Sequence, residues 1–188
     1  MQPNHRTIIK GDYNMIKNTF LKKTGFKVCP KCASTDIQDN ANNMQCNACG
    51  YRIFFNVAAA TSCILTKDNM ILFVVRKNNP KKGLYDLPGG FADYDETLEE
   101  GMKRELLEEI SYNPPSLTYF SSYPNTYEFA SVQYHNMDCF FTGNFEETAY
   151  LKANDDAESI VWVKICDIDF DTIAFDSVKK ALNQYISR

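Results

Sequence analysis

Three glutamates lie close together in the sequence, at spacings that place their side chains on one face of a helix. Glu105, Glu108 and Glu109 fall within one narrow arc at roughly 100° per residue. Like charges at i, i+4 spacing repel each other and destabilise an isolated helix. A divalent cation relieves that repulsion, and ligands that are all oxygen favour the hard ions Mg²⁺ or Mn²⁺. The cluster therefore indicates a site for Mg²⁺ or Mn²⁺.

A solvated charged helix is the alternative interpretation of the same segment. Arg104 can pair with both Glu100 and Glu108 at i, i+4 spacing, which is ordinary for a helix surface. The residues just upstream favour the metal site instead. Pro88-Gly89-Gly90 is a turn that lets backbone approach a ligand closely, and Glu96 follows it at a fixed offset.

Local signals bound the helix that carries these glutamates. Thr97 and Glu100 form a capping box, so the helix is predicted to begin there and to continue to about Ile110. Its apolar residues recur at i, i+4 and form a separate stripe that faces the core: Leu98, Met102, Leu106 and Ile110.

The whole segment resembles the Nudix box, G-x5-E-x7-R-E-U-x-E-E-x-G-U, in which U is aliphatic. Seven of the nine specified positions fit: Gly90, Glu96, Arg104, Glu105, Leu106, Glu108 and Glu109. Ser111 replaces the box glycine and Tyr112 replaces the last aliphatic residue. The glycine marks a helix end in the left-handed conformation, which serine adopts at a cost of about 1 kcal/mol. These departures affect the following loop more than the carboxylates.

Composition limits the classes of protein that fit. The 188 residues are enough for one ordinary domain and a small module, with 44% hydrophobic and 23% charged residues. The net charge of −4 argues against a general nucleic-acid binder. No apolar run reaches the roughly 20 residues that span a membrane, and no signal peptide is evident. An odd number of cysteines, seven, without a secretion signal then predicts a reducing cytoplasm.

Four cysteines form a second chemical pattern. Cys29, Cys32, Cys46 and Cys49 are spaced C-x2-C-x13-C-x2-C around a short polar loop. Two such knuckles direct four thiolates at one tetrahedral ion, which suits structural Zn²⁺. A disulfide pair is the alternative, and the missing secretion signal counts against it. The segment has almost no core of its own, so Zn²⁺ would supply its folding free energy. The three remaining cysteines are expected to be buried thiols: Cys63, Cys139 and Cys166.

Apolar runs predict the strands around the box. Residues 57–65 and 70–75 read as two strands joined by a polar turn, and residues 117–123, 127–135, 137–142 and 159–164 read as later strands. From Ser177 onward, apolar residues at helical spacing predict an amphipathic helix that packs on the sheet. We assign residues 1–25 to an N-terminal arm, 26–54 to a zinc ribbon and 55–188 to the catalytic domain.

A zinc ribbon followed by a Nudix box resembles the NADH pyrophosphatase subgroup over roughly residues 26–165. The resemblance implies an α/β/α sandwich with a mixed sheet, preceded by the small ribbon. It also implies roles for residues of the box. Glu105, Glu108 and Glu109 would hold Mg²⁺ or Mn²⁺, helped by a carbonyl near Gly89. Arg104 would orient a box carboxylate, and Glu96 would support the loop.

The resemblance also suggests substrate contacts outside the helix. Arg76 lies where relatives often place an arginine beside the substrate. Glu158 lies where some supply a carboxylate before the last strand, and a solvated residue at the start of that strand is an equal alternative. Apart from the resemblance, the charges of Lys81 and Lys82 in the loop into the box suit contact with phosphates, but an ordinary solvated role is favoured for each lysine. Tyr123, Tyr127 and Phe129 are candidates for stacking on a base, although strand alternation favours packing for at least two of them. Glu108, Glu109 and Glu158 are all candidate general bases.

The expected activity is metal-dependent hydrolysis of a nucleoside diphosphate linked to another moiety: ADP-ribose, NAD(H) or a related dinucleotide. The subgroup motif S-Q-P-W-P-F-P-x-S is only partly matched from Ser122 to Tyr127, so NADH itself is not predicted. Two alternatives stay open. One is a nucleoside triphosphate or RNA-cap pyrophosphohydrolase, and the other is a non-catalytic binding protein. Dimerisation is expected only from the subgroup.

Overall fold

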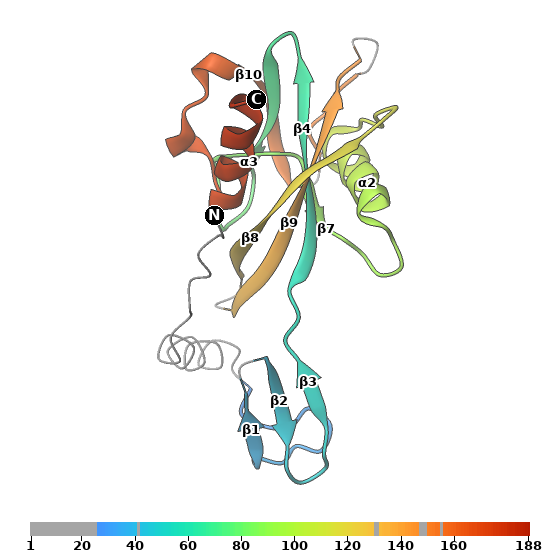
Figure 1. Ribbon diagram of the computed structural model, residues 1–188, viewed down its shortest axis with the longest axis vertical. Coiled ribbons are helices and arrows are strands. Elements are labelled where there is room, and N and C mark those ends of the chain that lie inside the picture. Colours follow the sequence, from blue (N-terminus) through green and yellow to red (C-terminus); the bar gives the residue numbers. More distant parts are fainter. Residues whose placement is uncertain (1–25, 41, 130–131, 147–149, 155) are drawn as a thin grey trace, which may run out of the picture. The chain divides into compact units, whose positions relative to one another are not determined.

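The computed structural model describes residues 26–188 except 41, 130–131, 147–149 and 155, so the predicted N-terminal arm lies outside the described residues. The chain divides into two compact units, which we describe separately (Figure 1). The first comprises Met1–Asn56 with Ala130–Gln133, and the second comprises Val57–Phe129 with Tyr134–Arg188.

The first unit contains a three-stranded antiparallel sheet built around the cysteine pairs. Its strands are β1 (Ile37–Asp39), β2 (Asn43–Cys46) and β3 (Arg52–Phe54), in the order β1-β2-β3. Among the described residues of this unit, the buried apolar side chains are few: Cys29, Met44 and Cys46 are buried, whereas Phe54 is exposed. So little buried apolar surface in the described part of the ribbon is the condition under which a structural metal is needed.

The second unit is organised around a mixed seven-stranded sheet. Its strands are β4 (Ala58–Lys67), β5 (Met70–Arg76), β6 (Tyr85–Asp86), β7 (Gly89–Phe91), β8 (Thr118–Phe129), β9 (Val132–Asn144) and β10 (Ala157–Lys164). The main order is β10-β5-β4-β9-β8, with β6 beside β5 and β7 beside β4. The β4–β9 pair is parallel, and β4 pairs antiparallel with β5 and β7.

Two helices cover the two faces of this sheet, as Figure 1 shows. Helix α2 (Leu98–Ile110) packs through Met102, Leu106 and Ile110 on a cluster that includes Cys63 and Phe141. Helix α3 (Asp176–Ile186) packs on the opposite cluster, and two short 3₁₀ turns precede it (Ile165–Asp167 and Phe170–Thr172). This arrangement confirms the predicted α/β/α sandwich with a mixed sheet.

The predicted ends of helix α2 agree with the structure in detail. Both bonds of the capping box form: the Glu100 backbone N–H donates to Thr97 Oγ1, and the Thr97 N–H donates to the Glu100 carboxylate at 2.8 Å. Ser111 ends the helix at φ 56°, in the left-handed conformation expected of the box glycine. Tyr112 is buried, and its hydroxyl donates to the Asn144 carbonyl and accepts from the Glu146 N–H.

Several predicted strand limits were wrong. Residues 127–135 are not one strand, because β8 ends at Phe129 and β9 begins at Val132. Pro124 does not interrupt β8, which lies at the edge of the main strand order, where a missing N–H is tolerated. Strand β7 was not predicted. Cys166 lies exposed in a 3₁₀ turn rather than buried, whereas Cys63 and Cys139 are buried as expected. None of the helices in the described residues is long and apolar enough to cross a membrane.

Candidate active site

Arg104 gathers three of the box carboxylates around one guanidinium group. Its Nη2 and Nε donate to both oxygens of Glu96, at 2.7 and 3.1 Å. Its Nη1 donates to Glu105 at 2.8 Å and to Glu108 at 3.0 Å, and Nη2 also donates to the Phe91 carbonyl. The hydrogen bonds that Glu96 accepts, chiefly those from Arg104, lower its pKa. Arg104 therefore joins the helix to the loop before it.

Glu109 lies on the buried side of the same helix. Only 7% of the residue is exposed, and its Oε2 accepts the Gly89 backbone N–H at 2.9 Å. Burial raises the pKa of Glu109 to about 8; the Gly89 hydrogen bond opposes this, and the nearby carboxylates Asp86, Glu105 and Asp156 add to it. A neighbouring cation would favour the ionised carboxylate.

Two glycines provide the space in which these carboxylates lie. A Cβ on Gly89, whose φ is +150°, would stand 2.0 Å from the Thr61 carbonyl oxygen across the β4–β7 pairing. A Cβ on Gly90 would stand 2.5 Å from Glu105 Oε1. No larger residue fits here without displacing β4 or a box carboxylate.

The chemistry of these donors fits a hard divalent cation. Three carboxylates and nearby backbone carbonyls are the ligands that Mg²⁺ or Mn²⁺ takes. Arg104 holds Glu105 and Glu108, while Gly89 holds Glu109. Among the described residues, only the four ribbon cysteines place three or more ligand atoms within 4.8 Å of one another. The glutamates would therefore have to draw together around an ion.

The strand Gly89–Phe91 also borders a cavity on the α3 side of the sheet. Three aromatic rings form an interacting set along it: Phe91 contacts Tyr127 edge-on at 5.9 Å, and Tyr127 contacts Phe175 at 6.1 Å. Arg76 also lines the cavity, with its guanidinium 4.9 Å from the centre of the Phe175 ring. Its Nη1 donates to Asp86 at 2.8 Å.

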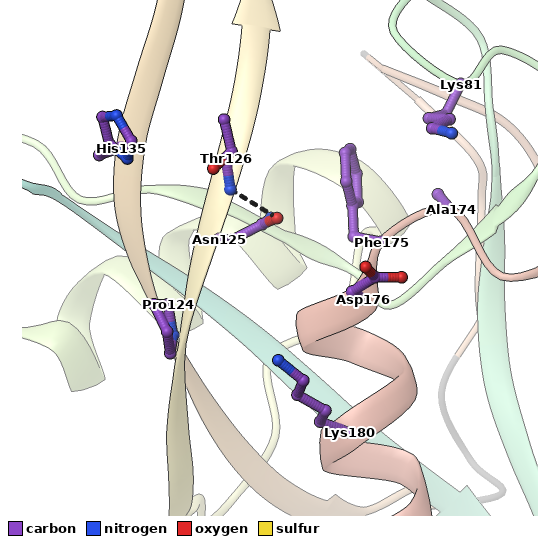
Figure 2. Close-up of a pocket in the computed structure, with 9 residues that line it drawn as sticks. All are labelled: Lys81, Pro124, Asn125, Thr126, His135, Ala174, Phe175, Asp176 and Lys180. Atoms are coloured by element: carbon purple, nitrogen blue, oxygen red, sulfur yellow. Dashed lines mark hydrogen bonds between the residues drawn. The ribbon is translucent and has the colours of Figure 1, made fainter. Parts of the chain in front are cut away.

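A second cavity of about 440 Å³ shares Asn125 and Phe175 with the first. Figure 2 shows its lining, with Lys81 and Lys180 reaching in from the loop after β5 and from α3. Asp176 adds an opposite charge at the start of α3. Together the two cavities offer aromatic walls and basic groups beside the box, which are features suited to a nucleotide.

Not all of the predicted substrate contacts lie together. Arg76, Gly89, Gly90 and Tyr127 line the first cavity. Tyr123 instead packs on Phe140, and its hydroxyl donates to Gln184 near the end of α3 at 2.8 Å. Glu158 is exposed at the bulge that begins β10. The side chain of Phe129 lies outside the part of the chain that the structure describes.

Sequence reasoning missed a group of polar residues in this region. Asn125, Asn136 and Asp138 line the first cavity, and Asp138 is buried. Burial raises the pKa of Asp138, while the hydrogen bonds that it accepts lower it. Asp156, which acts on Glu109, was also missed. An amide and a carboxylate two positions apart in β9, Asn136 and Asp138, were the available signal.

The ribbon cysteines have the geometry of a metal centre. Their sulfur atoms lie 3.7 Å apart for Cys29 and Cys49 and 3.6 Å apart for Cys32 and Cys46. Sulfurs at the corners of a Zn²⁺ tetrahedron with bonds of about 2.3 Å lie roughly 3.8 Å apart. The Lys31 N–H donates to Cys29 Sγ at 3.4 Å, a contact that supports a thiolate. The donors fit structural zinc.

The second unit therefore has a mixed sheet between two helices, with a carboxylate-rich helix beside a short glycine-containing strand. The chain belongs to the NUDIX family, whose domain model matches residues 56–182. A NUDIX hydrolase structure from Nitrosomonas europaea superposes with a TM-score of 0.63 at 21% identity, over 86% of this chain and 91% of that one.

Two curated relatives match parts of the chain. An "ADP-ribose pyrophosphatase" from Methanocaldococcus jannaschii is 48% identical over 64 residues, which cover 34% of this chain and 38% of that protein. An "NAD-capped RNA hydrolase NudC" from Haemophilus influenzae is 31% identical over 110 residues, or 57% of this chain and 41% of that protein. The matches therefore span less than half the length of either relative.

Proposed function

We propose that this protein hydrolyses the pyrophosphate bond of a nucleoside diphosphate linked to a second moiety, such as ADP-ribose or NAD(H), and releases a nucleoside monophosphate. The observation that carries this proposal is the position of β7 between two sites. Gly89 donates its N–H to Glu109 of the box, and both Gly89 and Gly90 line the aromatic cavity. A nucleotide held in that cavity would have its phosphates beside the carboxylates.

The relatives support the same substrate class. ADP-ribose and the NAD cap both contain adenosine diphosphate, and these are the compounds in the names of the two curated relatives. The two cavities together offer what such compounds need. The first has ring faces for a base and Arg76 for anionic oxygens, and the second has Lys81 for anionic oxygens.

The residues of the box have separate tasks in this proposal. Glu105, Glu108 and Glu109 would hold Mg²⁺ or Mn²⁺. A bound ion of this kind neutralises pyrophosphate charge and polarises water. Arg104 positions Glu105 and Glu108 while Glu96 holds Arg104 in place. Developing charge on phosphoryl oxygens would be stabilised more than the ground state, which is the requirement for catalysis.

The proton of the attacking water needs an acceptor, and three carboxylates are candidates. Glu108 has a side chain that is 49% exposed, so it can reach water while it is bound to Arg104. Glu109 is buried, and Glu158 is exposed on β10. Single glutamine variants of the three, with kcat measured across pH at saturating Mg²⁺, would identify the acceptor as the residue whose loss removes the fall in kcat at low pH, because a proton acceptor must be deprotonated to act.

The test is product analysis on the purified chain with Mg²⁺ or Mn²⁺. The compounds are ADP-ribose, NAD⁺, NADH, a diadenosine polyphosphate and a nucleoside triphosphate. AMP should be released from the first three, and Glu108→Gln should lower kcat at least about a hundredfold. Glu99→Gln is the matched control, because Glu99 is an exposed carboxylate in the first turn of the same helix.

Other results would redirect the proposal. Turnover of the triphosphate alone would favour the triphosphate hydrolase, and release of a 5′-monophosphate RNA from NAD-capped RNA would extend the substrate to the one that the NudC relatives are named for. No turnover of any compound, with Mg²⁺ bound and zinc present, would favour the binding protein. Sedimentation analysis tests the expected homodimer independently.

A further inference from the structure

A buried hydrogen-bond network lies under the first cavity, on the α3 side of the sheet. The Asp138 carboxylate is its centre and is only 6% exposed. It accepts hydrogen bonds from Asn125 Nδ2 at 2.8 Å and Ser177 Oγ at 2.5 Å, and also from Asn136 Nδ2. Burial raises the pKa of Asp138, and the three donors oppose this by favouring its ionised form. An ionised carboxylate only accepts hydrogen bonds.

This network fixes which way the Asn136 amide faces. Its NH₂ group must face the Asp138 carboxylate, so its Oδ1 must face away from it. Asn136 is 4% exposed and lines the cavity, and its Oδ1 has no hydrogen-bond partner among the described residues. Burying an amide oxygen without a partner is unfavourable, and a ligand that donates to it would recover that free energy.

Two neighbouring polar groups differ from Asn136 Oδ1. Asn125 Oδ1 accepts the Thr126 backbone N–H at 2.8 Å, the dashed line in Figure 2. The Thr61 hydroxyl also lacks a partner, but Thr61 is paired with Cys139 rather than with Asp138, so strand alternation directs it to the α2 face. Asn136 Oδ1 is therefore an unpartnered acceptor in the wall of the cavity on the α3 side, and a ligand would reach it only by displacing the atoms that cover it.

We propose that Asn136 is a specificity-determining residue whose amide oxygen accepts a hydrogen bond from the exocyclic amino group of adenine. This inference rests on the proposed function, which supplies an adenine nucleotide. The aromatic rings along the cavity suit the flat faces of a base, and the buried acceptor suits an N–H₂ group on its edge. Asp138 is the positioning residue, because it prevents the amide from turning over.

Hypoxanthine provides a close comparison with adenine. It has the same ring shape, but a carbonyl oxygen replaces the amino group. That oxygen would face Asn136 Oδ1, so two acceptors would meet in a buried place. An amide free to rotate would present its NH₂ group instead, and Asp138 removes that freedom.

The experiment measures binding of ADP-ribose and of inosine diphosphate ribose by calorimetry, without added divalent cation so that neither is hydrolysed. ADP-ribose should bind about tenfold to a hundredfold more tightly. In Asn136→Ala the ratio of the two dissociation constants should fall to about one. Ser121→Ala should keep the ratio. It too deletes a buried polar atom without a partner, here a hydroxyl, but at a position outside the lining of either cavity.

Equal affinities in the unchanged protein, or no binding of either compound, would overturn the inference even if Asn136→Ala fails to fold. Retained discrimination in a folded Asn136→Ala would also overturn it. Failure of the proposed function gives a different result. Preferential binding of ADP-ribose with no hydrolysis in Mg²⁺ would refute the hydrolase and leave adenine recognition in place.

Discussion

Alanine at Gly89 should make the second unit easier to unfold, whereas alanine at the adjacent Gly90 should spare folding and weaken cation binding. The two glycines differ in what a new Cβ would meet. At Gly89 it would meet the backbone of β4, 2.0 Å from the Thr61 carbonyl oxygen. At Gly90 it would meet the end of the Glu105 side chain, at 2.5 Å.

These distances set the expected magnitudes. Ordinary contact begins near 3.4 Å, so Gly89→Ala requires a backbone displacement of about 1.4 Å within a paired strand, at φ +150°. Overpacking and backbone strain together predict a loss of about 3 kcal/mol in the free energy of unfolding. At Gly90 the Glu105 carboxylate can retreat by about 0.9 Å on its own bonds. The unfolding free energy should then change by about 0.5 kcal/mol or less.

Urea unfolding followed by tryptophan fluorescence measures the first effect. The chain has a single tryptophan, Trp162 in β10, so the fluorescence signal reports the second unit. Gly89→Ala should lower the midpoint by about 1–2 M urea. Calorimetric titration with Mg²⁺ measures the second effect. A carboxylate moved by about 0.9 Å lies outside the roughly 0.2 Å tolerance of a metal–ligand distance, so Gly90→Ala should weaken binding at least about tenfold.

Either of two results for the glycine variants would refute this reasoning. Equal urea midpoints for Gly89→Ala and the unchanged protein would mean that the β4–β7 pairing adjusts freely. Unchanged Mg²⁺ affinity in Gly90→Ala would mean that Glu105 is not a ligand, or that its position is not set by the space at Gly90.

Three further predictions concern stability. Burial raises the pKa of Asp86 from 3.8 to about 6, so the free energy of unfolding should fall by about 3 kcal/mol as the pH rises from about 4 to about 6. Asp86→Asn should flatten that decline, measured as urea midpoints across this pH range. An unchanged slope would refute this prediction. Tyr112→Phe should cost about 1 kcal/mol, read from the same midpoints, because the Asn144 carbonyl and the Glu146 N–H lose their partner; a stability equal to that of the unchanged protein would contradict this. A zinc chelator should release about one ion per chain and remove the dispersed amide resonances of the ribbon, while Trp162 fluorescence stays native; simultaneous unfolding of both units would contradict this.

The sequence predicts those parts of the site that depend on local spacing. Helix α2 begins at its capping box and ends at Ser111 because both signals lie within the segment itself. Four cysteines at two short spacings likewise predict a tetrahedral set of sulfurs. In both cases the residues that cooperate are neighbours along the chain or belong to one motif.

Features that depend on distant pairing were not predictable in the same way. Strand β7 has only three residues, and it is a strand because Gly89 and Gly90 pair with β4. Asp138 receives a hydrogen bond from Ser177, which lies 39 residues further along the chain. No local pattern links those two residues, so the polar network could not be inferred.

Tyr123 and Tyr127 show how position along a strand decides function when the face is the same. Residues four apart in β8 project to one side of the sheet. Helix α3 covers Tyr123, which bonds to Gln184 near the helix end, but only begins beside Tyr127, which contacts Phe175. One tyrosine is therefore packed and the other lines the cavity, a difference that the start of α3 determines.

Under the proposed function, strand β7 would link chemistry to recognition in this unit. Its backbone holds Glu109 through the Gly89 N–H, and the same two glycines border the cavity that Asn136 lines. Because β7 is paired with β4, its position is set by the sheet. The distance between a base in the cavity and the box carboxylates is therefore fixed by the sheet. A substrate is expected to be selected by the length between its base and its pyrophosphate as well as by the base itself.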